Sequence, residues 1–431
     1  MKLTSQEITH FLLAIAALLV VGHSLAAVFK KLRQPPVIGE ILGGLLLGPG
    51  VFGVIAPALF LQVFPNKEDS PSTDYILAAI YQMGLLLLMF CSGLEIRSSF
   101  AKDERRTAVF VTLTGTLIPF LFGIAAFEAF DPASQMGEAQ NRPAFLMVFA
   151  IAVAVTSIPV ISRIFMDLGI IETPLARMVL TAAVIEDVIL YVVLAIALSM
   201  VGGPLEAAWG LPQALGLHGR PAWGLVYHIG INLGFFAVAM FTGPRIFRWA
   251  DAFRFNVLKR SSRVGFLLLF LITMTCIALY LGITPMFGAF VAGMVAATTV
   301  GERIKPKETI RSFSFAFFVP VYFAIVGWKI DLARDFEPLF FLAFFAFACA
   351  VKAASVYVGA RAARESRAGA FNIAVAMNAR GGPGIVIASQ AYDARIIDSG
   401  FYTTLVLLAV LTSMLAGAWL DHVKRSGRPL R

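Results

Sequence analysis

The amino-acid sequence predicts an all-helical protein that crosses a membrane many times, and three observations carry this prediction. First, 59% of the 431 residues are hydrophobic and only 14% are charged, whereas a soluble chain carries about 25% charge. Second, apolar stretches recur along the chain, each close to the roughly 20 residues that a spanning helix needs. Third, the basic residues concentrate in alternate connections between these stretches, as expected for cytoplasmic loops.

Apolar runs predict thirteen spans, at about 9–28, 36–55, 74–94, 108–129, 143–166, 175–201, 222–243, 264–282, 284–301, 311–328, 337–360, 369–391 and 397–421. The first could be a secretory signal peptide, with Ser24–Ala27 as a cleavage site. However, Lys30 and Lys31 follow this run at once. Cleavage would leave these charges outside, against the positive-inside rule. We therefore expect a first membrane span.

The distribution of Lys and Arg predicts the orientation. With the N-terminus outside, 26 of the 35 basic residues fall in inside segments and 7 in outside segments. This bias predicts an outside N-terminus and a cytoplasmic C-terminus. If the seventh span is a linker, the chain forms two inverted six-helix repeats. A transport site would then lie at mid-depth between the repeats.

Two adjacent carboxylates, Glu186 and Asp187, lie in the middle of the sixth span. An ionisable residue at this depth is costly and usually functional. Neighbouring helical side chains point about 100° apart, so one carboxylate can face a cavity while the other faces a partner. The alternative is a purely structural ion pair that joins two helices.

Two spans carry helix-breaking residues at similar depth. The fifth contains Pro159, and the twelfth contains Gly381, Gly382 and Pro383. Proline removes a helical hydrogen bond, and glycine tolerates non-helical backbone. Matched interruptions in two halves of a membrane protein indicate a transport site, although a simple proline kink is the alternative for either one. We expect two broken helices that cross.

The interrupted spans also supply polar groups. The hydroxyls of Thr156 and Ser157, with freed carbonyls, offer the hard oxygen ligands that suit alkali cations. Arg380 could neutralise the carbonyl ends of the half-helices or pair with one of the two carboxylates. Lys352 is the other mid-depth base. It could snorkel to an interface, but a carboxylate partner is expected.

Other function classes find less support. Cys91, Cys276 and Cys349 lack metal-ligand spacing, and no nucleotide loop or catalytic triad is found, so no cofactor and no enzyme activity are expected. The net charge of +9 reflects inside loops rather than a nucleic-acid partner. A channel would need filter backbone, two acids disfavour an anionic substrate, and adjacent acids on one helix cannot form an aspartyl dyad.

Several motifs, taken together and in order, resemble the monovalent cation/proton antiporter superfamily, nearest its bacterial sodium/proton exchanger and potassium-efflux branch. They are Gly39-Glu40-Ile41-Leu42, Leu47-Gly48-Pro49-Gly50, Gly93-Leu94-Glu95, the Thr156-Ser157…Pro159 break, the acidic pair, Lys352 and Met377-Asn378-Ala379-Arg380-Gly381. The resemblance covers essentially the whole chain.

The resemblance implies a homodimer in which each protomer has a dimerisation domain and a mobile core domain. Residues 1–107 and 264–335 would form the dimerisation domain, 108–202 and 336–431 the core, and 203–263 a linker span with a cytoplasmic loop. It also implies the inner (plasma) membrane and a role in pH homeostasis. The chain ends soon after the last span, so no nucleotide-binding regulatory domain is expected.

The resemblance assigns roles to the charged residues. Asp187 matches the aspartate that binds the cation and the proton, and Lys352 matches the lysine that pairs with the preceding position. That position is Glu186 here, where electrogenic members often have aspartate, so the stoichiometry is open. The expected activity is exchange of a monovalent cation for protons by alternating access, with sodium or lithium first and potassium as the alternative.

Overall fold

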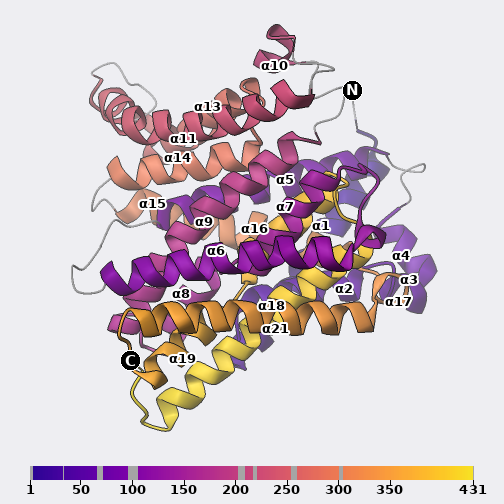
Figure 1. Ribbon diagram of the computed structural model, residues 1–431. Coiled ribbons are helices and arrows are strands. Elements are labelled where there is room, and N and C mark those ends of the chain that lie inside the picture. The colour runs from indigo at the N-terminus through magenta and orange to yellow at the C-terminus, as the bar shows by residue number, and fades with distance from the viewer. Residues whose placement is uncertain are drawn as a thin grey trace. The chain divides into compact units, whose positions relative to one another are not determined.

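The computed structural model describes residues 3–32, 34–65, 71–95, 105–201, 209–216, 221–253, 260–299 and 304–430. Within these ranges all regular structure is helical, apart from one isolated antiparallel bridge between Met136 and Ile397 (Figure 1). The predicted all-helical class is confirmed.

The helices group into two compact units. Unit 1 comprises Met1–Leu32, Pro36–Arg97 and Gly234–Asp335, and unit 2 comprises Arg33–Pro35, Ser98–Leu233 and Phe336–Arg431. One long helix, α11 (Pro221–Ala252), is divided between the units.

Unit 1 is built from helices of both chain halves. They are α1 (Ser5–Lys31), α2 (Pro36–Leu47), α3 (Phe52–Ile55), α4 (Pro57–Val63), α5 (Pro71–Glu95), α13 (Arg263–Tyr280), α14 (Pro285–Thr299), α15 (Ile304–Phe313), the π-helical turn η2 (Ser314–Phe318), α16 (Val319–Trp328) and α17 (Leu332–Asp335). The side chain of Glu95, part of one sequence motif, lies outside the described part.

Glycines allow the helices of unit 1 to approach backbone to backbone. A Cβ atom at Gly44 of α2 would lie 1.7 Å from the carbonyl oxygen of Ala324 of α16. A Cβ at Gly327 of α16 would lie 1.9 Å from the carbonyl oxygen of Ile41. Small residues at helix contacts are typical of membrane proteins, and the glycines of α2 and α16 have this packing role here.

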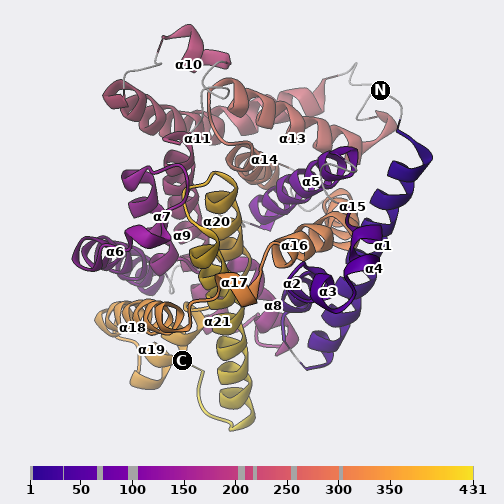
Figure 2. The same cartoon turned by 90° about the vertical axis from the view of Figure 1, so that its right-hand side faces the viewer.

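Unit 2 is likewise built from both halves. It contains α6 (Arg105–Phe130), the 3₁₀ turn η1 (Ala133–Gln135), α7 (Arg142–Ala154), α8 (Ile158–Asp167), α9 (Pro174–Ser199), α10 (Gly210–Ala214), α18 (Pro338–Ala362), α19 (Arg367–Ala376), α20 (Gly381–Asp393) and α21 (Ser399–Arg425). In this unit α20 contacts α7, α8, α9 and α21 (Figure 2).

Side-chain caps fix where several helices of unit 2 begin. Asn141, Thr173 and Asp398 each accept a hydrogen bond from the backbone N–H three residues later. Such caps satisfy N–H groups that have no helical partner.

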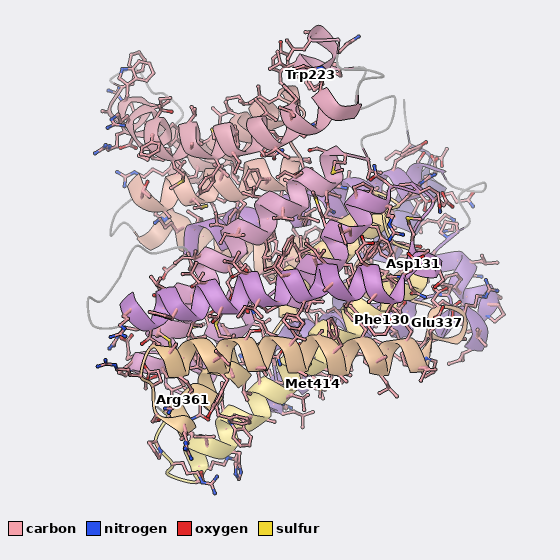
Figure 3. The ribbon with its side chains drawn as sticks, in the orientation of Figure 1. Phe130, Asp131, Trp223, Glu337, Arg361 and Met414 are labelled. Atoms are coloured by element: carbon pink, nitrogen blue, oxygen red, sulfur yellow. The ribbon has the colours of Figure 1, made fainter. Side chains whose placement is uncertain are left out.

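Helices α6 and α18 pack against each other. This pair has Asp131 and Glu337 at one end and Arg361 at the other (Figure 3).

Ten helices among the described residues are long and apolar enough to cross a membrane. The chain is therefore a multi-pass membrane protein. The predicted spans 143–166 and 369–391 are each folded as two shorter helices, and span 284–301 corresponds to α14, with 15 residues. The number of thirteen spans stays a prediction.

Both predicted helix breaks are present in unit 2. α7 ends at Ala154 and α8 begins at Ile158. α19 ends at Ala376 and α20 begins at Gly381, whose φ of +31° favours glycine. Pro159 is in the first turn of α8, where its missing N–H costs nothing; its side chain lies outside the described part. Gly382 and Pro383 are buried in the first turn of α20.

Candidate functional site

The two helix breaks of unit 2 are bonded to each other. The backbone N–H of Ser157 donates to the carbonyl of Ala379 at 2.7 Å, and the hydroxyl of Thr156 donates to the carbonyl of Met377 at 2.6 Å. The hydroxyl of Ser157 accepts from the N–H of Val160 and so caps α8. Thr156 and Ser157 are fully buried. Each interruption therefore supplies hydrogen-bond partners for backbone groups of the other. Non-helical backbone inside a membrane requires such partners.

Arg380 binds the carbonyl end of α7 and one carbonyl within α18. Its guanidinium donates to the carbonyls of Ala152 and Val153, in the last turn of α7, and to the carbonyl of Ala348 in α18. It also donates to the side chain of Asn378. A cation is favourable at a helix C-terminus, where the dipole is negative. Of the two alternatives for Arg380, the geometry favours neutralisation of carbonyls over pairing with a carboxylate.

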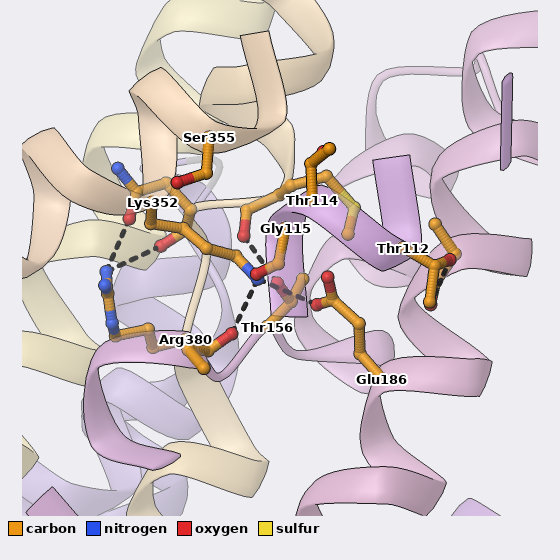
Figure 4. Close-up of polar contacts among 12 residues, drawn as sticks. Thr112, Thr114, Gly115, Thr156, Glu186, Lys352, Ser355 and Arg380 are labelled. Atoms are coloured by element: carbon orange, nitrogen blue, oxygen red, sulfur yellow. Dashed lines mark hydrogen bonds and ion pairs between the residues drawn. The ribbon is translucent and has the colours of Figure 1, made fainter. Parts of the chain in front are cut away.

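Lys352 is completely buried on α18, so it does not snorkel. Its Nζ atom donates to the carboxylate oxygen Oε2 of Glu186 at 2.9 Å, to the carbonyl of Ala154 at 2.6 Å and to the carbonyl of Gly115 at 2.8 Å (Figure 4). These three acceptors use all three N–H groups of an ammonium. Lys352 and Arg380 together therefore cover the last three carbonyls of α7.

Glu186 and Asp187 lie side by side on α9 and are 0% and 1% exposed. One oxygen of Glu186 is held by Lys352. Within the described part of the chain, the other oxygen of Glu186 and both oxygens of Asp187 have no hydrogen-bond partner. A buried carboxylate without a partner is strongly unfavourable unless a proton or a cation neutralises it. Asp187 can therefore take either one.

Sequence reasoning missed three contributors to this site. The hydroxyls of Thr412 and Ser413 on α21 accept from the backbone N–H groups of Arg380 and Gly381 and so cap α20. Two adjacent hydroxyl residues in an apolar span were the available signal. The third contributor is Gly115, and its signal is Pro119, four residues later in α6.

The chain belongs to the sodium/hydrogen exchanger family, because the family's sequence model for the transmembrane region matches residues 14–424 of this chain. The family is a transporter family. The superfamily resemblance in the sequence is thus confirmed.

Several relatives match over most of this chain. It is 27% identical to the Na(+)/H(+) antiporter NhaS4 of Synechocystis, covering 94% of this chain and 96% of that protein. It is 25% identical to a Na(+)/H(+) antiporter of Enterococcus hirae, with the same coverage of 94% and 96%. The K(+)/H(+) antiporter 1 of Saccharomyces cerevisiae is 27% identical over 96% of this chain, but the chain spans only 46% of that protein.

The structure resembles that of the sodium proton antiporter MjNhaP1 from Methanocaldococcus jannaschii at pH 8. The TM-score is 0.63 at 15% sequence identity, covering 97% of this chain and 98% of the other. This likeness shows a shared fold.

Proposed function

We propose that the protein is a secondary antiporter that exchanges a monovalent cation, sodium or lithium first, for protons. The carrying observation is the fully buried Asp187 carboxylate, whose oxygens have no hydrogen-bond partner among the described residues. Family membership and relatives named as Na(+)/H(+) antiporters support the assignment.

Charge balance explains why cation and proton compete. Glu186 and Lys352 neutralise each other at 2.9 Å, and the guanidinium of Arg380 donates to backbone carbonyls of α7 and α18. Among the described residues, Asp187 is then the acid of the pair whose carboxylate has no hydrogen-bond partner, and one proton or one monovalent cation neutralises it. Thr156 and Ser157 lie in the break between α7 and α8 and supply hydroxyl oxygens as further ligands.

Movement of one domain against another gives alternating access in this proposal. Unit 2 would be the mobile core, because it contains both breaks and the acidic pair, and unit 1 would form the homodimer interface. The protein would lie in the inner (plasma) membrane with its N-terminus outside. Binding and release at one mid-depth site then alternate between the two sides.

Exchange by purified protein in proteoliposomes tests the function. Addition of sodium or lithium chloride to acid-loaded vesicles should raise the internal pH, and Asp187→Asn should abolish this while leaving the protein folded. Asparagine removes both the proton site and the charge that attracts the cation. The control is Asp393→Asn, at the exposed end of α20, which should exchange like the wild type. Near-wild-type exchange by Asp187→Asn would refute the assignment.

Potassium is the alternative cation. The yeast relative is named as a K(+)/H(+) antiporter, and a Bacillus cereus relative as a Na(+)/H(+)-K(+) antiporter. Potassium chloride in the same assay shows whether the protein exchanges potassium or only sodium and lithium for protons. A channel would conduct without counterflow of labelled cation, whereas a carrier shows counterflow.

A further inference from the structure

Helix α6 contains a proline, Pro119, within its apolar length. Proline has no N–H, so the carbonyl of the residue four positions earlier lacks its helical donor. That residue is Gly115. A backbone carbonyl without a partner is costly at membrane depth, and it needs a donor from outside its own helix.

The donor is Lys352. Its Nζ atom lies 2.8 Å from the carbonyl oxygen of Gly115, beside its contacts with Ala154 and Glu186 (Figure 4). Gly115 is thus one of three acceptors that hold a fully buried ammonium. A buried N–H without an acceptor is unfavourable, so the position of Nζ depends on all three.

Gly115 also makes room for the carboxylate. A Cβ atom there would lie 2.9 Å from Oε1 of Glu186 and 2.9 Å from a methyl carbon of Val356. Both distances are shorter than a normal van der Waals contact. The same residue therefore provides a backbone oxygen for Lys352 and space for Glu186.

We infer that Pro119 is a positioning residue for antiport, because it frees the Gly115 carbonyl that holds the Lys352 ammonium against Glu186. This inference rests on the proposed function. With the ammonium held in this way, Asp187 is left for the cation. If an N–H at position 119 bonds to the Gly115 carbonyl, the Lys352 ammonium loses part of its hold. The ammonium then competes with the transported cation for the two adjacent carboxylates.

The cation dependence of exchange tests this role. Pro119→Ala should raise the cation KM about three- to tenfold, with a maximal rate close to wild type. Pro244→Ala removes the internal proline of α11 instead and should leave KM unchanged. A Pro119→Ala variant whose backbone amide at position 119 is an ester has no N–H there, and it should recover the wild-type KM. An unchanged KM in Pro119→Ala, or an ester variant that keeps the raised KM, overturns the inference.

Thermal unfolding gives a test that does not depend on exchange. If Pro119 acts through Lys352, its change to alanine should shift Tm differently in the wild type and in Lys352→Ala, by about 2 °C or more. Additive shifts overturn the inference. Absence of any exchange by the wild-type protein would refute the proposed function, while this double-mutant cycle would still decide whether Pro119 acts through Lys352.

Discussion

At the residue scale, Glu186 and Lys352 form an ion pair in which both side chains are 0% exposed. Charges at this depth are unfavourable unless their hydrogen bonds are satisfied. Lys352 meets this condition with three acceptors. Glu186 meets it with one of its two oxygens. The ammonium of Lys352 therefore has more of its hydrogen bonds satisfied than the carboxylate of Glu186. Substitutions of Lys352 and of Glu186 should for this reason change the stability by different amounts.

We expect Lys352→Ala to cost about 3–5 kcal/mol of stability, because it leaves a buried carboxylate uncompensated. Glu186→Gln should cost less, since an amide oxygen still accepts from the ammonium. The double change should recover part of the loss, and thermal unfolding of the four proteins measures this. Additive losses would contradict the pairing. If the pair also titrates during transport, the double mutant should exchange with a smaller dependence on membrane voltage.

The sequence was informative about this pair and less so about its neighbour. Within the predicted spans, Lys352 and Arg380 are the only bases expected near mid-depth, and this scarcity was enough to expect a carboxylate partner for Lys352. It left two alternatives for Arg380, because the choice depends on which carbonyls lie within reach. Those carbonyls, at Ala152, Val153 and Ala348, come from helices far apart in the chain.

At the scale of elements, the interruptions of α7–α8 and α19–α20 could be predicted because proline and glycine act through their own backbone. The bonds between the interruptions could not be predicted, since they require the two segments to meet at a particular register. Short helices such as α3, α4 and α10 were also missed. They have four to seven residues, and so few residues give little periodicity to detect.

Among the described residues, one side-chain hydrogen bond joins the two interruptions. The hydroxyl of Thr156 donates it to the carbonyl of Met377 at 2.6 Å. Thr156→Val keeps the shape but leaves this buried carbonyl without that donor, so we expect a loss of about 1–3 kcal/mol in stability. Thr156→Ser should restore most of it. Thermal unfolding measures both effects.

A matched control is Thr403→Val on α21. Thr403 is also buried in unit 2, and its hydroxyl has no hydrogen-bond partner in the described ranges. Its replacement should therefore change stability little. Equal losses for Thr156→Val and Thr403→Val would show that the bond between the interruptions contributes nothing measurable.

At the scale of the whole molecule, both units draw helices from both halves of the chain. Each half supplies one interrupted pair to unit 2, α7–α8 from the first and α19–α20 from the second. This is the arrangement that two inverted repeats would produce. Inversion requires an odd number of spans between corresponding points of the two halves, so the orientation of the connections tests it.

Cysteine labelling of three exposed serines tests the orientation in a background without Cys91, Cys276 and Cys349. Ser134 lies between α6 and α7, Ser261 precedes α13, and Ser426 follows α21. Three predicted spans separate the first two positions and six separate the last two. An impermeant maleimide should therefore label Ser134→Cys in intact cells, and label Ser261→Cys and Ser426→Cys only in inverted vesicles. Labelling of Ser134→Cys and Ser426→Cys from the same side would refute the nine spans predicted between them, and opposite sides for Ser261→Cys and Ser426→Cys would refute the second six-helix repeat.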